Sequence, residues 1–152
     1  MNITRRAALA TALLAATTLL AAPAFADDGA PATATFVVRV IEASKGDTPT
    51  VDPRIEEMRR ELRPFESRYN RFALVREATF TLQVQGSQEV LLPANSKFAL
   101  QFVGLQPGKV PRVRYHATTP GGKTMRSVAP GARTLDAIGN GDKLTIVSTL
   151  VR

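Results

Sequence analysis

The 152-residue sequence contains no cysteine, no tryptophan and only one histidine. Without cysteine the chain can form no disulfide, and it lacks the residue on which a bacterial lipoprotein is acylated. One histidine and no cysteine cannot supply the three or four protein ligands of a usual zinc site. The absence of tryptophan argues against carbohydrate binding, which commonly uses flat aromatic platforms. The composition therefore predicts a fold that depends on packing alone, with no metal and no cofactor.

The residues that catalysis most often uses are few, and each has a simpler structural interpretation. His116 is the only imidazole, and it falls on the polar face of a predicted strand, 113–117, as a solvated histidine would. No Gly-x-Ser-x-Gly motif is present. The segment 139–142, Gly-Asn-Gly-Asp, has too few oxygen ligands for calcium and is typical of a turn. We therefore expect no catalytic residue and a protein that is not an enzyme.

The N-terminus has the pattern of a secretory signal peptide. Arg5 and Arg6 precede an apolar run, and Ala24-Phe25-Ala26 supplies the small residues that a signal peptidase accepts. Residues 1–26 are therefore the predicted signal peptide, with cleavage after Ala26, and the predicted location is periplasmic or secreted. The adjacent arginines also resemble the twin-arginine export pattern, so both export routes stay open. We expect no transmembrane segment in the mature form.

The charge of the chain is moderately basic. The net charge is +7, and removal of residues 1–26, which hold two arginines and no acidic residue, leaves +5. The 126 remaining residues are enough for one domain with one core. A basic excess favours contact with anionic partners without specifying one. Outside the cytoplasm, nucleic acid is not an expected partner.

The hydrophobic pattern after residue 33 is mainly that of β-strands. A polar leader, 27–33, precedes a β-branched strand at 35–41, which has apolar residues on both faces. Asp52-Pro53 marks a helix start, and apolar residues at helical spacing predict one helix over 53–63, which ends near Pro64. Further alternating segments follow at intervals of about ten residues. We predict a single domain, 34–152, built as an antiparallel β-sandwich of about seven or eight strands with one packed α-helix.

Several segments resemble a family of small, uncharacterised exported bacterial proteins. The residues that carry the resemblance are Val40-Ile41-Glu42-Ala43-Ser44, Val51-Asp52-Pro53, Leu62, Phe65, Tyr69, Phe72, Leu74 and Leu91-Leu92-Pro93. The resemblance implies a strand, an Asp-led helix, an aromatic segment and a Leu-Pro turn before a run of β-strands. Pro64 departs from the uninterrupted helix that the family has at this point. The resemblance implies no catalytic residue and no ligand.

Arginine is frequent between residues 59 and 77. Glu56 and Glu57 stand three or four residues before Arg59 and Arg60, a spacing that pairs charges on a helix. Acidic residues here, including Glu61 and Glu66, are therefore predicted to form ion pairs rather than a catalytic carboxylate pair. The arginines with the fewest acidic neighbours form a predicted group for contact with an anion or a partner: Arg63, Arg68, Arg71, Arg76, Arg112 and Arg114.

Two functional hypotheses follow from these patterns. The first is a non-enzymatic exported accessory domain that binds another macromolecule, such as a protein partner, through a sheet edge or its basic face. The alternative is a binder of an anionic envelope component through the arginine-rich face. An ion-paired, solvated surface without a binding role is the competing interpretation of the same arginines.

Overall fold

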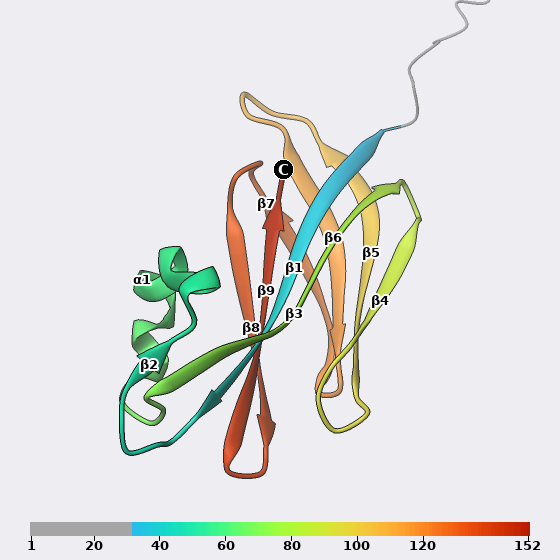
Figure 1. Cartoon of the computed structure of the whole chain (residues 1–152). Coiled ribbons are helices and arrows are strands. Elements are labelled where there is room, and N and C mark those ends of the chain that lie inside the picture. Colours follow the sequence, from blue (N-terminus) through green and yellow to red (C-terminus); the bar gives the residue numbers. More distant parts are fainter. Residues whose placement is uncertain (1–31) are drawn as a thin grey trace, which may run out of the picture.

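The protein is a β-sandwich with a short helical segment packed on one side (Figure 1). The computed structural model describes residues 32–152. The predicted signal peptide, 1–26, and the predicted leader up to residue 31 lie outside the described residues. The first strand begins at Thr33, one residue before the predicted domain boundary. The predicted fold class is confirmed.

Two sheets make up the sandwich. The five-stranded sheet contains, in spatial order, β2 (Thr50–Val51), β3 (Arg71–Gln83), β1 (Thr33–Ser44), β9 (Lys143–Val151) and β8 (Arg133–Asn140). The four-stranded sheet contains β4 (Ser87–Leu91), β5 (Lys97–Gln106), β6 (Arg112–Thr119) and β7 (Gly122–Val128). Neighbouring strands are antiparallel except for β2, which pairs with β3 in parallel.

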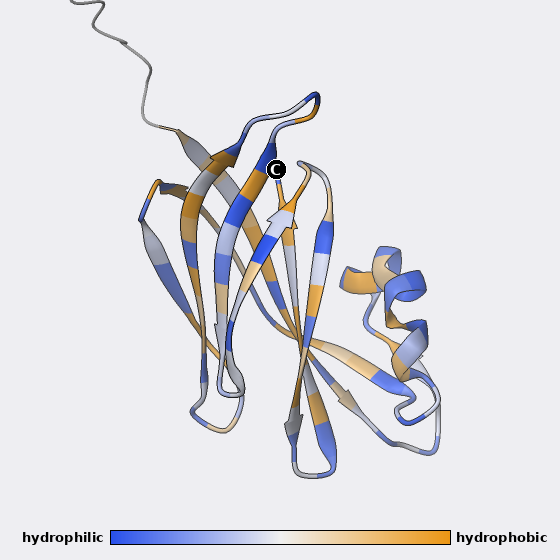
Figure 2. Cartoon of the chain, turned by 180° about the vertical axis from the view of Figure 1, so that it is seen from behind, coloured by the Kyte–Doolittle hydropathy of each residue, from blue (hydrophilic) through white to orange (hydrophobic). Residues whose placement is uncertain are grey.

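The main core lies between the sheets. Phe36, Val38 and Val40 of β1 are fully buried against residues of β5 and β6. The ring of Phe36 packs edge-on against Tyr115, with ring centroids 5.4 Å apart. The hydroxyl of Tyr115 shares a hydrogen bond of 2.7 Å with Thr134 Oγ1, which ties the two sheets together. Because this core takes one face of each strand, apolar residues recur at alternate positions along these strands, as Figure 2 shows.

A second, smaller core lies on the outer face of the five-stranded sheet. The segment that packs there, which we name the helical cover, comprises η1 (Pro53–Met58), α1 (Arg59–Leu62) and η2 (Arg63–Phe65). Its fully buried residues Ile55, Met58 and Leu62 contact Ile41 and Ile146 of the sheet in one cluster. The alternate residues of β1 thus face two different cores, which explains why the strand is apolar on both faces.

The helical prediction was correct in position and partly wrong in type. Asp52 caps the segment as predicted, because its Oδ1 accepts a hydrogen bond of 3.0 Å from the N–H of Arg54. Of the three helical elements, only α1 is α-helical. The φ of −125° at Ile55 interrupts the 3₁₀ turns of η1, which precede α1. The two flanking 3₁₀ turns each contain a proline near their start.

Two strands differ from the sequence prediction. β3 begins at Arg71 instead of residue 77, and a bulge opposite Val40 and Ile41 changes the face of its side chains. The bulge lets one strand supply Phe80 to the main core and Phe72 to the smaller core. β8, which the sequence indicated only as a short segment between turns, forms an edge of the five-stranded sheet.

Candidate binding surfaces

The six arginines of the predicted group do not meet on one surface. Four lie in the five-stranded half, on the helical cover, on the loop after it and on β3: Arg63, Arg68, Arg71 and Arg76. The other two, Arg112 and Arg114, project from the outer face of β6, because Val113 and Tyr115 are buried between the sheets. The arginine-rich face is therefore corrected to two separate groups on different halves of the sandwich.

The outer face of the five-stranded sheet, named the covered face from here on, is dense in ion pairs. Arg39 of β1 donates hydrogen bonds to Glu57 of the helical cover and to Glu77 of β3. Arg133 of β8 lies 3.3 Å from Glu61 of the cover. The hydrogen bond from Arg39 holds the pKa of Glu57 below its usual value. These pairs fasten the helical cover to β1 and β8 by charge as well as by packing, and Glu77 extends the pairing to β3.

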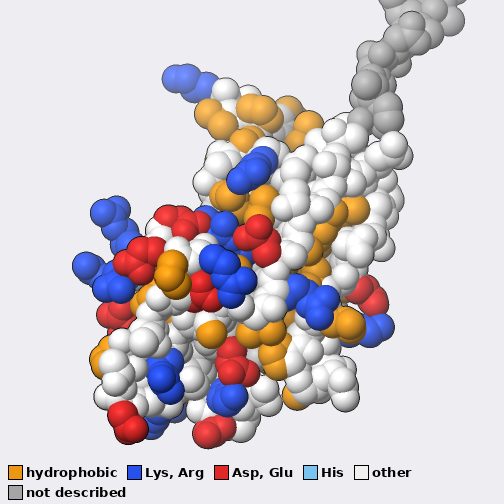
Figure 3. Space-filling model, viewed as in Figure 1, with side chains coloured by type: hydrophobic (Ala, Val, Ile, Leu, Met, Phe, Trp, Pro, Cys, Tyr) orange, Lys and Arg blue, Asp and Glu red, His pale blue; other side chains and the backbone are white. Residues whose placement is uncertain are grey.

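Charges on this half of the molecule nearly balance. Residues 32–86 and 129–152, which form this half, contain twelve Lys or Arg and ten Asp or Glu. The predicted pair Glu56–Arg59 is present, with an N–O distance of 2.9 Å. The predicted pairing of Glu57 with Arg60 is wrong, because Glu57 contacts Arg39 of the sheet instead. Figure 3 accordingly shows acidic and basic side chains intermixed over the helical cover.

A groove runs around Tyr69, between the loop at 44–50 and the segment at 66–70. Asn70 organises it: its side chain accepts from the N–H of Gly46 at 2.8 Å and donates to the carbonyl of Gly46 at 2.7 Å. Its backbone also bonds Ser44 and Thr50. We name this feature the Tyr69 groove, because Tyr69 lines each of its three adjoining hollows.

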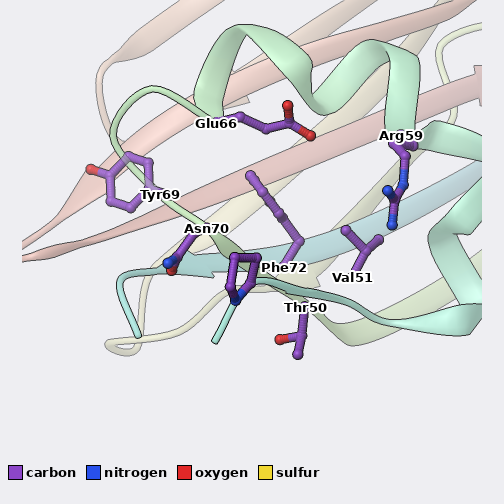
Figure 4. A pocket seen from close by; sticks show the side chains of 8 residues that line it. Thr50, Val51, Arg59, Glu66, Tyr69, Asn70 and Phe72 are labelled. Carbon is purple, nitrogen blue, oxygen red and sulfur yellow. The ribbon is translucent and has the colours of Figure 1, made fainter. Parts of the chain in front are cut away.

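The largest hollow of the Tyr69 groove has a volume of about 390 Å³ (Figure 4). Its walls are half polar and half apolar and come from β2, β3 and the loops before them, with Arg59 and Glu66 above them: Pro49, Thr50, Val51, Arg59, Glu66, Tyr69, Asn70 and Phe72. The neighbouring hollow of about 340 Å³ brings Arg68 close to Lys45, Asp142 and Lys143. Of these cations, Lys143 is paired with Glu42 at 2.8 Å. The groove therefore mixes both charge signs and does not select one.

The outer face of the four-stranded sheet has the opposite character, and we name it the uncovered face. None of its outward-facing residues on β5, β6 and β7 is buried, and Figure 2 shows no helix over it. Residues 90–135 contain seven Lys or Arg and no Asp or Glu. The acidic residue of this sheet, Glu89, is paired with Lys97 at 2.8 Å. Four further cations lie on this face or at its end: Lys109, Arg112, Arg114 and Lys123.

Sequence reasoning included Arg112 and Arg114 but missed Lys109 and Lys123. It followed the local density of arginine at 59–77, where acidic residues from the same half balance the charge. The informative signal was instead the long span without any acidic residue. A count of Asp and Glu along the chain would have found this basic surface, because the strands of that span place alternate residues on the outer face of one sheet.

The free edge of β3 is a third candidate surface. β2 pairs only with Arg71 and Phe72. Two residues further on, the side chains of Asp52 and Arg54 bond the N–H and carbonyl of Leu74. Beyond that point β3 has a neighbouring strand on one side only. Its stretch 78–83, Ala-Thr-Phe-Thr-Leu-Gln, is uncharged, whereas the edge strands β4, β7 and β8 each contain a charged residue.

The chemistry available around His116 is limited. His116 lies on the uncovered face of β6, half-buried, opposite Gln101 on one side and Met125 on the other. Neither neighbour is a nucleophile or a carboxylate that would orient an imidazole for catalysis. Within residues 32–152, no group of three or more His, Asp, Glu or Cys side chains is placed to hold a metal ion. Over the same range no helix is long and apolar enough to cross a membrane.

No protein-family model matches this chain, and no match was found among curated protein sequences or solved structures. The resemblance to small exported bacterial proteins therefore stays a prediction. Any function has to be argued from the chemistry of the surfaces described above.

Proposed function

We propose that this protein is an exported, non-enzymatic interaction domain that binds an anionic macromolecular surface through its uncovered face. The proposal includes the location predicted from the N-terminal signal pattern. The observation that carries it is the segregation of charge: the four-stranded half, residues 87–128, contains six basic residues and one acidic residue. The five-stranded half is almost neutral.

Physical reasoning supports this face over the arginines near the helical cover. Like charges that share a sheet face without acidic partners repel one another and lower the stability of the free protein. An anionic partner relieves that repulsion, so the release of this repulsion energy favours binding. Arg59 and Arg133 beside the helical cover are already paired with Glu56 and Glu61, and an external anion would have to displace or tolerate these acidic residues.

Retention on an immobilised sulfated polymer tests the proposal. A triple charge reversal on the uncovered face, Lys109→Glu, Arg114→Glu and Lys123→Glu, should abolish retention at low salt. The matched control reverses three cations of the other half, Arg60→Glu, Arg63→Glu and Arg76→Glu, and changes the net charge equally. Arg112 is left intact because it bonds Ser127 of β7. Equal loss of retention in both triple variants would mean that only net charge matters, and the proposal would fail.

A second candidate function is supported by the uncharged edge of β3. A partner protein could add an extended segment along 78–83 and pair with backbone groups that face away from β1. The N–H of Thr79 is one of these. Val84 donates its N–H to the carbonyl of Ala32 on the β1 side, so the even-numbered residues of this stretch direct their backbone groups toward β1 and Thr79 directs its own away from it. Thr79→Pro should abolish such pairing while Thr79→Val, which keeps the N–H, should not. Capture of a companion by both variants alike would exclude strand addition at this edge.

A further inference from the structure

The connection between β5 and β6 forms a projecting tip at one end of the sandwich (Figure 1). All residues from Leu105 to Arg112 are exposed, including Leu105 at 48% and Val110 at 59%. Lys109 lies between the apolar side chains. Figure 3 shows hydrophobic side chains gathered at this end, with a basic side chain projecting beyond them. Large apolar residues are thus presented to solvent next to a cation.

The tip is held rigidly at its base. Ser127 Oγ of β7 donates to Gln106 Oε1 at 3.0 Å, and Arg112 Nε donates to Ser127 Oγ at 3.2 Å. Pro107 and Pro111 restrict the backbone between these anchors. Both prolines also lack an N–H, so two fewer backbone donors lose their hydrogen bonds to water if the tip enters an apolar environment. The tip is therefore both pre-ordered and inexpensive to desolvate.

Apolar and basic groups lie together at the same end of the molecule. Val110 and Lys109 lie in the turn of the tip. Arg112 pairs with Gln106, Leu105 pairs with Val113 one residue further from the turn, and Arg114 follows on β6. Apolar and basic side chains are therefore interleaved over a short length, which suits the interface of an anionic bilayer, where acyl chains meet negative headgroups. A soluble polyanion offers no apolar layer for the tip side chains.

We propose that the β5–β6 tip inserts Leu105 and Val110 into the interface of an anionic lipid bilayer, while Lys109, Arg112 and Arg114 contact the headgroups. This inference rests on the proposed function and names its ligand class as a lipid surface. Charge complementarity selects the anionic bilayer, because the tip and the strands that carry it belong to a stretch, 90–135, without any acidic residue.

Vesicle binding of the exported protein, collected as the host cell processes it, provides the first test. The probe is vesicles of phosphatidylglycerol and phosphatidylcholine in equal amounts, compared with phosphatidylcholine alone. Leu105→Ser with Val110→Ser should weaken binding to the anionic vesicles about tenfold or more. Val75→Ser with Leu91→Ser, which alters equally exposed apolar residues away from the tip, should leave binding within about twofold.

The same variants separate failure of this inference from failure of the proposed function. If the tip inserts, Leu105→Ser with Val110→Ser keeps full retention on the sulfated polymer and loses vesicle binding. Unchanged vesicle binding in this variant would overturn insertion, while the charge-reversal result would still stand. If the triple charge-reversal variant still bound both the sulfated polymer and the anionic vesicles, the proposed function itself would be overturned.

A fluorescence measurement makes the test independent of affinity. Because the chain has no tryptophan, Val110→Trp introduces a single reporter. Its emission should shift to shorter wavelength with the anionic vesicles and be quenched by brominated acyl chains. Val75→Trp, on β3, is the matched control and should not respond. An unshifted, unquenched Val110→Trp spectrum with vesicle-bound protein would contradict insertion.

Discussion

The two outer faces of this sandwich are made stable in water in different ways. The covered face buries Ile41 and Ile146 under a segment of the chain itself and ties that segment down with ion pairs. No segment of residues 32–152 covers the uncovered face in this way, and none of its outward-facing residues on β5, β6 and β7 is buried. A sheet face without a cover is stable in water when it carries few large apolar residues.

Charge separates the two faces as clearly as packing does. Acidic residues are abundant where the helical cover must be held in place and absent from 90 to 135. Acidic residues of the same half nearly balance the charge of the arginines near residues 59–77, of which Arg59 is ion-paired with Glu56. Arg112 and Arg114 form no ion pair with the described acidic residues. The lesson is that a binding surface is better indicated by missing counter-charges than by a high local density of arginine.

The largest expected difference between the faces is in packing energy. Met58→Ala removes a fully buried side chain from beneath the helical cover and should lower the free energy of unfolding by about 2–5 kcal/mol. Met125→Ala, on the uncovered face, should change it by less than about 0.5 kcal/mol. Urea unfolding of both variants measures the two values. Similar losses would mean that the uncovered face is also packed against something.

Much of this packing could be predicted from the sequence. The alternation in β1 and the spacing of Ile55, Met58 and Leu62 identify both cores, because burial on one face imposes a period on the sequence. The bulge in β3 could not be predicted, since Val75 is simply one residue more than the alternation allows. The same holds for the Arg39 pairs, which join residues far apart in the chain.

The candidate surfaces were less accessible to sequence reasoning. The arginine group was selected by nearness in sequence, but the fold divides it between the two sheets. The Tyr69 groove depends on Asn70 and Gly46, which are 24 residues apart and have no local signature. The acid-free span was visible in the sequence, and its meaning depended on knowing that no part of residues 32–152 covers the outer face of the four-stranded sheet.

The next largest effect concerns the loop that flanks the covered face. Asn70→Ala removes both side-chain hydrogen bonds to Gly46 and leaves part-buried backbone groups without partners. The free energy of unfolding should fall by about 1–3 kcal/mol. Gln83→Ala, an exposed change on β3, is the control and should be near neutral. A neutral Asn70→Ala would show that the loop at 44–50 is held by other contacts.

An effect of acid on stability should arise at the N-terminal cap of the helical cover. Hydrogen bonds from the Arg54 side chain, its backbone N–H and the Leu74 N–H lower the pKa of Asp52 well below its ordinary value of 3.8. The resulting stabilisation is fully present above the ordinary value and is lost as the pH falls through and below it. Denaturant midpoints of the wild type should fall more steeply with acid below about pH 4 than those of Asp52→Asn. Parallel curves would contradict this assignment.

The smallest expected effect concerns charge on the free protein. Arg114→Gln relieves repulsion on the uncovered face and should raise the free energy of unfolding by about 0.2–0.5 kcal/mol at low salt. Arg39→Gln breaks two ion pairs on the covered face and should lower it. Salt should reduce the gain in Arg114→Gln. A loss in Arg114→Gln would mean that this arginine has an internal partner.

Hydrogen exchange with and without anionic vesicles tests the central claim most directly, because it compares both faces in one unaltered protein. Protection is expected in the β5–β6 tip and the adjoining parts of β6 and β7, with the helical cover and the Tyr69 groove unchanged. Protection centred on residues 53–70, with none in residues 105–128, would contradict the claim that the uncovered face is the binding surface.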